Sequence, residues 1–166
     1  MGHYVAPLDQ THDVKSFDCG TEKLNTWLQT IAGQHQTKGL SKTFVLVDDK
    51  APTTIIGFYA LAIRRMTPKE ALPAELARKL PADIPGYTLA RLAIATRSAK
   101  QGFGADLLVD AMRRAQQVAN QVGGAFLFVD AKDQTAADFY RHFGFVPLLD
   151  DPLTLAMPIS AIEDYE

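Results

Sequence analysis

The sequence predicts an α+β domain in which helices flank a mixed β-sheet. A chain of 166 residues is the right length for a single domain, residues 1–166, with a sizeable core. The apolar share of 47% and the charged share of 22% are ordinary for a globular protein. Strand-like and helix-like segments follow in the order β-α-β-β-β-α-β-α-β-β without repeats, linkers or low-complexity tracts, and this order is typical of α+β folds.

The first part of the chain is expected to supply one helix and three strands. Apolar residues recur at helical spacing from Leu24 to Ile31, and Asp18 or Thr21 can cap the start of this helix. Gly39 is expected to end it. The predicted elements are a strand at 3–8, a helix that continues to about residue 38, and antiparallel strands at 43–47 and 55–63.

The segment from Thr67 to Pro85 is predicted to be a long surface connection. Prolines recur along it and leave room only for short helical fragments, such as LPAELARKL. Long connections often carry substrate contacts because they lie on the surface of a rigid scaffold.

The rest of the chain is organised around Thr88–Gln121, which is interpreted as a buried strand, a basic turn and a long amphipathic helix. The strand, Leu89–Ile94, is mostly apolar. The helix has an apolar face with spacings of three and four residues, formed by Leu107, Leu108, Ala111, Met112, Ala115, Val118, Ala119 and Val122.

The turn between this strand and this helix is a candidate phosphate-binding site. Unpaired backbone N–H groups and the helix dipole favour an anion at a helix N-terminus, and glycines allow close approach and positive φ. Arg97 and Lys100 add positive charge. The sequence QGFG matches neither the dinucleotide fingerprint nor the Walker motif, and a plain strand–helix turn remains the alternative interpretation.

The end of the chain is predicted to contain further strands around a short helix. Gly123 and Gly124 end the long helix, and an apolar strand follows over Ala125–Ala131. The helix Thr135–His142 has Asp133 or Thr135 near its cap, and the segments GFVPLL and LTLAMPI are the final strands. Without further context, Tyr140 near the end of this helix is interpreted as a core or rim aromatic residue.

Charge and rare residues exclude several functional classes. The net charge of −2 gives no global basic field, although the middle of the chain is basic and its tail acidic. Cys19 is the only cysteine and is expected to be a packing residue, and the scattered histidines predict no metal site. The start of the chain lacks a signal-peptide pattern and no long apolar run occurs, so we expect a cytoplasmic protein.

Two segments resemble the motifs of a known enzyme family. LARLAIATRSAKQGFGADLLVDAM resembles the acyl-CoA-binding motif of the GNAT N-acetyltransferases, and AADFYRHFGFVPL resembles the motif that follows it. In the family pattern R/Q-x-x-G-x-G/A, Gly102 and Gly104 match the two small positions. Ala99 stands where Arg or Gln is usual, and Lys100 stands where glycine is common. These departures remove a polar contact and an easy position for φ > 0, and they add a charge near the phosphates.

The resemblance extends over nearly the whole chain. With FDCGTEKLNTWL, the pair VLVDD and IIGFYALAI, and IPGYTLARLAI, the chain is similar to the GNAT toxins of bacterial toxin–antitoxin systems. It implies a GNAT fold whose mostly antiparallel sheet has a splayed central pair of strands. It also implies acetyl-CoA-dependent acetylation of the α-amino group of aminoacyl-tRNA, which inhibits translation. The implied partners are a ribbon–helix–helix antitoxin that represses the operon at operator DNA, and a second copy in a homodimer.

The resemblance also implies roles for individual residues. Tyr140 matches the general acid that protonates the departing CoA thiolate, after direct attack of the amine on the thioester. Lys100 is expected within reach of the CoA phosphates. The implied cofactor-binding residues are Leu92, Ala93, Ile94, Arg97, Ala99, Lys100, Gln101, Gly102, Phe103, Gly104, Ala105 and Phe139. Arg78, Lys79 and Arg91 are candidates for contacts with tRNA phosphates.

Two alternatives stay open beside this interpretation. The chain can be a GNAT enzyme that acetylates protein N-termini or a small amine, or a non-catalytic CoA-binding module. Neither motif contains an obvious carboxylate base that could deprotonate the substrate amine. This favours an α-amine as the substrate, because its pKa of about 7.7–8.0 leaves part of it uncharged at pH 7, whereas a lysine amine near 10.4 is almost wholly protonated.

Overall fold

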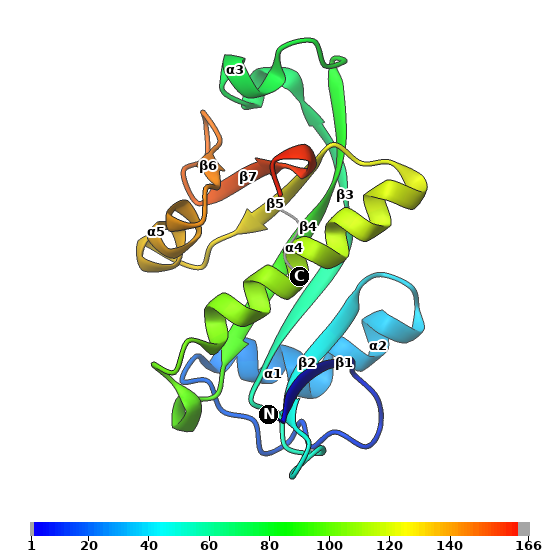
Figure 1. The fold of residues 1–166 in the computed structure, drawn as a ribbon, viewed down its shortest axis with the longest axis vertical. Helices are drawn as coiled ribbons and strands as arrows, with labels where there is room; N and C mark the ends of the chain where they lie inside the picture. Colours follow the sequence, from blue (N-terminus) through cyan, green and yellow to red (C-terminus); the bar gives the residue numbers. More distant parts are fainter. Residues whose placement is uncertain (1, 163–166) are drawn as a thin grey trace. The chain divides into compact units, whose positions relative to one another are not determined.

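The computed structural model describes residues 2–162, and Figure 1 traces the chain through them. The strands are β1 (His3–Pro7), β2 (Lys42–Asp48), β3 (Gly57–Pro68), β4 (Asp83–Ile94), β5 (Phe126–Asp130), β6 (Val146–Pro147) and β7 (Thr154–Pro158). The helices are α1 (Glu22–Thr30), α2 (Ala32–Thr37), α3 (Ala74–Ala77), α4 (Phe103–Val122) and α5 (Gln134–His142). Short 3-10 turns lie at η1 (Lys69–Ala71), η2 (Thr96–Ser98) and η3 (Ile159–Ala161).

The strands form a seven-stranded sheet with the order β1-β2-β3-β4-β5-β7-β6. β4 and β5 are parallel, whereas β1–β2, β2–β3, β5–β7 and β6–β7 are antiparallel. The sheet is therefore mixed and mostly antiparallel, and helices flank it, which confirms the predicted α+β class.

The chain divides into two compact units, which are described separately. The first contains the residues up to Ala62 together with Ala90–Ala111, and the second contains Ile63–Leu89 together with the residues from Met112 onward. β3, β4 and α4 each contribute residues to both units.

The first unit is built on β1, β2 and the start of β3, with α1 and α2 coloured blue to cyan in Figure 1. Val45 and Val47 on β2 are fully buried and belong to one core cluster with Leu28 of α1. In the same cluster, the ring of Phe58 stacks on that of Trp27 with centroids 6.1 Å apart. Aromatic side chains bury large apolar areas, so this cluster is a main source of the unit's stability.

The core of the second unit lies around β5 and β7. Phe126 and Phe128 of β5 are buried together with Ile84 of β4 and Ala156 of β7. Leu72, which precedes α3, belongs to the same cluster. The connection between β3 and β4 therefore packs on the sheet of this unit and contributes to its core.

Several predicted boundaries differ in the structure. The first helix is interrupted at Ile31, which has a φ of −116° and separates α1 from α2. β3 continues to Pro68 and β4 starts at Asp83, so the connection is shorter than predicted. Pro85 is tolerated inside β4 because a proline lacks only the N–H donor, and its carbonyl still accepts a hydrogen bond from the N–H of Ala125 at 2.9 Å.

The helices α4 and α5 are present as predicted, and α5 begins at Gln134, one residue before the predicted start. On the predicted apolar face of α4, Leu107, Leu108 and Ala111 are fully buried, but Val118 and Val122 are exposed. The apolar period therefore continues along α4 beyond the part that the core covers. Asp133 caps α5 by accepting a hydrogen bond from the N–H of Ala136 at 2.9 Å.

Candidate functional site

The end of β4 is held close to the start of β3. The N–H of Ala95 donates to the carbonyl of Ile56 at 2.8 Å. A Cβ atom on Gly57 would lie 2.8 Å from the carbonyl oxygen of Ala93 and 2.6 Å from Cδ1 of Ile94. Real Cβ atoms essentially never come this close, so only glycine allows β3 to approach β4 here.

The pairing between β4 and β5 ends before β4 does, so the last residues of β4 have no partner on β5. Leu89 is paired with Val129, one residue before β5 ends, and β4 continues to Ile94. This register gives Leu92, Ala93 and Ile94 no partner on β5. The family resemblance implies that these three residues bind acetyl-CoA, and their edge toward β5 has no strand partner.

The turn between β4 and α4 has the backbone conformation of an anion-binding loop. Lys100 has a φ of +64° and Gly102 a φ of +83°, and both residues are exposed. Within the described residues, no acceptor is found for the N–H groups from Gln101 to Ala105, at the start of α4. Successive free N–H groups next to left-handed residues form a concave set of donors, which favours an anion.

Lys100 therefore adopts the conformation that glycine commonly supplies in this family pattern. A left-handed conformation costs a residue with a Cβ atom about 1–2 kcal/mol. The departure from the pattern leaves the turn left-handed at this position and adds an exposed cation to it.

The beginning of the turn is anchored to two other segments of the first unit. The N–H of Thr96 donates to the carbonyl of Asp18 at 2.9 Å, and Nη2 of Arg97 donates to the carbonyl of Ile55 at 3.3 Å. The carboxylate of Asp18 accepts hydrogen bonds from the N–H of Gly20 at 2.9 Å and from Nδ2 of Asn25 at 3.0 Å. These hydrogen bonds hold the carboxylate in its charged form and lower its pKa. The hydrogen bond from Arg97 to Ile55 shows that part of the Arg97 guanidinium supports the turn.

Tyr140 lies on the buried face of α5, with 6% of its surface exposed. Its ring makes edge contacts with Phe139 and Phe145 at centroid distances of 5.3 and 5.9 Å. No side-chain hydrogen bond of Tyr140 is found in the part of the chain that the structure describes. Burial, and after it the negative charge of Asp130, raises the pKa of Tyr140 well above its ordinary value near 10. Tyr140 is therefore a protonated phenol at neutral pH.

A carboxylate that the sequence did not single out accompanies Tyr140 in the second unit. Asp130 is the last residue of β5, and its Oδ1 lies 3.6 Å from Nη1 of Arg64. Arg64 also donates to the hydroxyl of Thr88 at 3.1 Å and lies over the ring of Phe128, with Cζ 4.5 Å from its centroid. The only hint in the sequence is an acidic residue at the end of an apolar strand.

The predicted basic residues do not form one group. Arg78 and Lys79 are exposed at the end of α3 in the second unit, where Lys79 has a φ of +68°. Arg91 belongs to the first unit, where its guanidinium lies over the indole of Trp27, with Cζ 4.5 Å from the ring centroid. Arg91 therefore stabilises the packing of α1 on β4.

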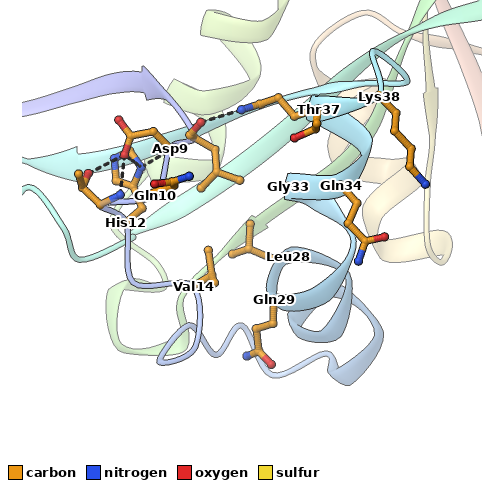
Figure 2. Close-up of a pocket in the computed structure, with 13 residues that line it drawn as sticks. Asp9, Gln10, His12, Val14, Leu28, Gln29, Gly33, Gln34, Thr37 and Lys38 are labelled. Carbon is orange, nitrogen blue, oxygen red and sulfur yellow. Dashed lines mark hydrogen bonds and ion pairs between the residues drawn. The ribbon is translucent and has the colours of Figure 1, made fainter.

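A large open pocket lies elsewhere in the first unit, between the loop after β1 and the helices α1 and α2 (Figure 2). Its volume is about 1090 Å³. None of the predicted site residues lines it. Its polar groups serve the fold: Gln36 bridges the carbonyl of Leu8 and the N–H of Thr43, and His12 accepts a hydrogen bond from the N–H of Asp9.

Within residues 2–162, no group of three or more His, Cys, Asp or Glu side chains is arranged to hold a metal ion. In the same range, no helix is both long and apolar enough to span a bilayer. Cys19 is partly buried against the first core cluster, and its thiol contacts the carbonyl of Thr21 at 3.6 Å.

The predicted site residues are shared between the two units. Leu92 to Ala105 and Arg91 belong to the first unit, whereas Phe139, Tyr140, Arg78 and Lys79 belong to the second. Within the first unit the structure brings the end of β4, the turn and the start of α4 together. Within the second it brings Tyr140 into the neighbourhood of Asp130.

Comparison with known proteins reveals close relatives. No family model matches the sequence. The tRNA-acetylating toxin of Mycobacterium tuberculosis (strain ATCC 25618 / H37Rv) is 34% identical over 159 residues, which cover 95% of this chain and 93% of that protein. A tyrosine-to-phenylalanine mutant of KacT has a TM-score of 0.91 with 28% identity over 98% of both chains. AtaT in complex with acetyl-methionyl-tRNAfMet has a TM-score of 0.89 with 31% identity over 96% of both chains.

Solved complexes of AtaT and KacT are also similar to this chain in structure. AtaTR bound with acetyl-CoA has a TM-score of 0.82, 29% identity, and coverage of 97% of this chain and 96% of that chain. A mutant AtaT bound to the C-terminus of the antitoxin AtaR has a TM-score of 0.82, 30% identity, and coverage of 98% and 96%. The KacTA–DNA complex has a TM-score of 0.80, 27% identity, and coverage of 96% and 95%.

Proposed function

The chain belongs to the family of tRNA-acetylating toxins with the GNAT fold, and we propose that it transfers the acetyl group of acetyl-CoA to the α-amino group of an aminoacyl-tRNA and thereby inhibits translation. The observation that carries this proposal is the left-handed turn with free N–H groups, which precedes α4 and follows a strand end without a partner on β5. We also propose that residues 1–166 act as one N-acetyltransferase domain, because β3, β4 and α4 continue from one unit into the other.

In this proposal the first unit binds the co-substrate. The backbone of Leu92, Ala93 and Ile94 bonds the pantetheine arm, because the register with β5 leaves it free. The N–H groups from Gln101 to Ala105 receive the pyrophosphate. The side chain of Lys100 reaches the same phosphates, and Arg97 and Ala99 complete the turn. Phe139, half-buried beside Tyr140, is the proposed contact on the second unit.

The reaction needs no acyl-enzyme intermediate. Acetyl-CoA supplies an activated thioester, and a backbone N–H group of β4 polarises its carbonyl. The free amine attacks the carbonyl carbon, and Tyr140 gives its proton to the departing sulfur. An ordinary tyrosine and a thiol differ in pKa by about 1.5, which makes this transfer uphill by about 2 kcal/mol. The raised pKa of Tyr140 increases that barrier, so the transfer must be coupled to the proton that the attacking nitrogen loses.

The proposed tRNA contacts are made by cations of both units. Arg78 and Lys79 are exposed and can reach phosphates of an acceptor stem. Arg91 is stacked on Trp27, so its proposed contribution is the positive charge of a fixed guanidinium. Removing any one of them should weaken binding of all aminoacyl-tRNAs to a similar extent.

The proposed partners follow from the relatives. AtaT is known bound to the C-terminus of AtaR, and KacTA is known bound to DNA. We infer that this chain is neutralised by an antitoxin of the ribbon–helix–helix type, contacts operator DNA only through it, and forms a homodimer in the cytoplasm. Co-purification with the product of a neighbouring small reading frame, and the mass of the free toxin in solution, test these inferences.

The decisive experiment combines growth and chemistry. Induced expression should arrest bacterial growth, and the Tyr140→Phe variant should not. Labelled acetyl-CoA is then offered to the purified protein with charged tRNA, with N-terminal peptides or with a polyamine. Label only on charged tRNA supports the proposal, whereas label on peptides or polyamine favours a different GNAT substrate. Tight CoA binding without turnover on any of them would indicate a non-catalytic CoA-binding module.

A further inference from the structure

The carboxylate of Asp130 has one oxygen engaged and one free. Oδ1 lies 3.6 Å from Nη1 of Arg64 and 3.2 Å from the hydroxyl oxygen of Thr154. Within the described residues, Oδ2 has no polar partner. The side chain is 52% exposed, although it lies at the end of the otherwise buried strand β5. A charged acceptor is therefore open to a ligand.

The orientation of this carboxylate is fixed by Arg64. The arginine side chain is only 22% exposed, because it lies on the ring of Phe128 and donates to the hydroxyl of Thr88. A guanidinium held by a ring face and a hydroxyl has few rotamers left. Arg64 and the hydroxyl of Thr154 both face Oδ1 of Asp130, which leaves Oδ2 as the open oxygen.

Asp130 also lies near the proposed general acid. α5 begins at Gln134, shortly after β5 ends, and carries Tyr140 on its buried face. Burial, and after it the negative charge of Asp130, raises the pKa of Tyr140. Both groups belong to the second unit. A substrate group bound by Oδ2 would therefore lie in the unit that carries the proposed general acid.

We propose that Asp130 binds the α-ammonium group of the incoming aminoacyl ester through Oδ2, and that Arg64 is the residue that positions this carboxylate. The inference deepens the proposed function and rests on it. An α-amine with a pKa of about 7.7–8.0 arrives mostly protonated at pH 7, so the species to be recognised is a cation. A carboxylate is the natural acceptor for its N–H groups.

Each proton in the proposed reaction has a defined source and destination. The bound ammonium releases one proton to water, and its lone pair forms the C–N bond to the acetyl carbon. The C–S bond breaks, and the sulfur takes its electron pair and the proton of Tyr140. The proton then lost by the acetylated nitrogen restores the tyrosine. Asp130 holds the nitrogen throughout and is not consumed.

The charged neighbours of Asp130 determine how the reaction depends on pH. They are Arg64 from β3, Lys132 and Asp133 on the following loop, and Asp151 before β7, and the phenol of Tyr140 on α5 is neutral. The hydroxyl of Thr154 lies 2.7 Å from Asp151 and 3.2 Å from Asp130, and its single hydrogen serves one of them at a time. A carboxylate favours the charged form of a bound ammonium, so Asp130 raises the pKa of the bound amine.

The test compares Asp130→Asn with Asp138→Asn in the full-length protein. Asp138 is an exposed residue of α5 that bonds Gln134, so its substitution removes the same charge from the same unit. Acetylation of one aminoacyl-tRNA is measured from pH 6 to pH 9. We expect Asp130→Asn to lower kcat/KM about tenfold to hundredfold through KM for the tRNA, with KM for acetyl-CoA unchanged. The acid limb of kcat should move to lower pH by about one unit.

The other outcomes separate the possible failures. A wild-type protein that acetylates no aminoacyl-tRNA contradicts the proposed function itself. An active wild type with Asp130→Asn equal to Asp138→Asn contradicts only the role of Asp130. A loss of activity without movement of the acid limb also contradicts it, since that pattern indicates action through folding or through Tyr140. The Asp130→Glu variant retains the charge and should retain the wild-type acid limb, which keeps the test valid if the asparagine variant is unstable.

Discussion

In the proposed mechanism, the turn before α4 and the end of α5 contribute to the reaction by opposite physical means. The turn is exposed and works through backbone N–H groups, with left-handed residues at Lys100 and Gly102. Tyr140 is buried among aromatic rings and works through one side-chain atom. A site made of backbone tolerates a change of side chain as long as the chain keeps its path. A site made of one buried hydroxyl tolerates none.

The largest expected effect is that of Tyr140→Phe. Loss of a general acid lowers the rate about 10²- to 10⁴-fold. Since no hydrogen bond of the hydroxyl is found within the described residues, thermal stability should stay close to that of the wild type. The measurements are kcat on charged tRNA and the melting temperature of both proteins. A Tyr140→Phe variant with a much lower melting temperature, or one with an unchanged kcat, would contradict the prediction that the hydroxyl acts in catalysis and not in folding.

A smaller effect is expected where the backbone itself is displaced. In Gly57→Ala, the new Cβ atom would collide with the carbonyl of Ala93, and overpacking of this kind costs about 1–3 kcal/mol. Displacement of the strand end should reduce kcat/KM for acetyl-CoA about tenfold to hundredfold.

Gly33→Ala is the matched control for this variant. Nothing lies within 4 Å of a Cβ atom on Gly33 in α2, and alanine is the better helix former by about 0.5–1 kcal/mol. It should leave KM unchanged and stability equal or higher. Equal behaviour of the two alanine variants would show that Gly57 does not position β4.

Two substitutions of Lys100 separate the effect of its charge on acetyl-CoA binding from the effect of its left-handed backbone on stability. Lys100→Ala and Lys100→Gly both remove the cation, and both should raise KM for acetyl-CoA up to about tenfold. Only the glycine variant relieves the left-handed strain, so it should unfold at a higher temperature than the alanine variant. An unchanged KM in both would mean that the lysine side chain does not reach the phosphates.

The smallest expected effect is a pH dependence of stability through Asp18. Its folded-state pKa is lowered by hydrogen bonds from the N–H of Gly20 and from Asn25, so the unfolded state binds the proton more readily. The stabilisation is present above the unfolded pKa of about 3.9 and is lost as the pH falls through the folded value. Urea unfolding between pH 3 and pH 6 should show a shallower acid loss in Asp18→Asn than in the wild type.

The sequence was most informative where periodicity or a motif is local. The strand at 89–94, the turn and the long helix follow from neighbouring residues, and the structure agrees with them. Of the two predicted caps of α5, Asp133 and Thr135, the structure shows Asp133. The interruption at Ile31 and the extension of β4 back to Asp83 were not predicted. They depend on packing and pairing with distant segments, which a window of neighbouring residues does not contain.

The same limit explains the missed residues of the candidate site. Gly57 matters because it meets Ala93, and Asp130 matters because Arg64 reaches it from β3. In both cases the partners are distant in sequence, and nothing in the local pattern marks the pair. The charge of Arg91 and its place in the strand at 89–94 predict a contact with tRNA, but its stacking on Trp27 is a property of the folded unit.

The left-handed lysine has a practical consequence for following the enzyme. Lys100 and its neighbours Ala99 and Gln101 are exposed in a turn, so the peptide bond after Lys100 is accessible to trypsin. The proposed co-substrate would cover this bond, and the rate of cutting there would then report the fraction of protein with acetyl-CoA bound. The residue that departs from the family pattern thereby gives the turn a built-in cleavage site for measuring occupancy.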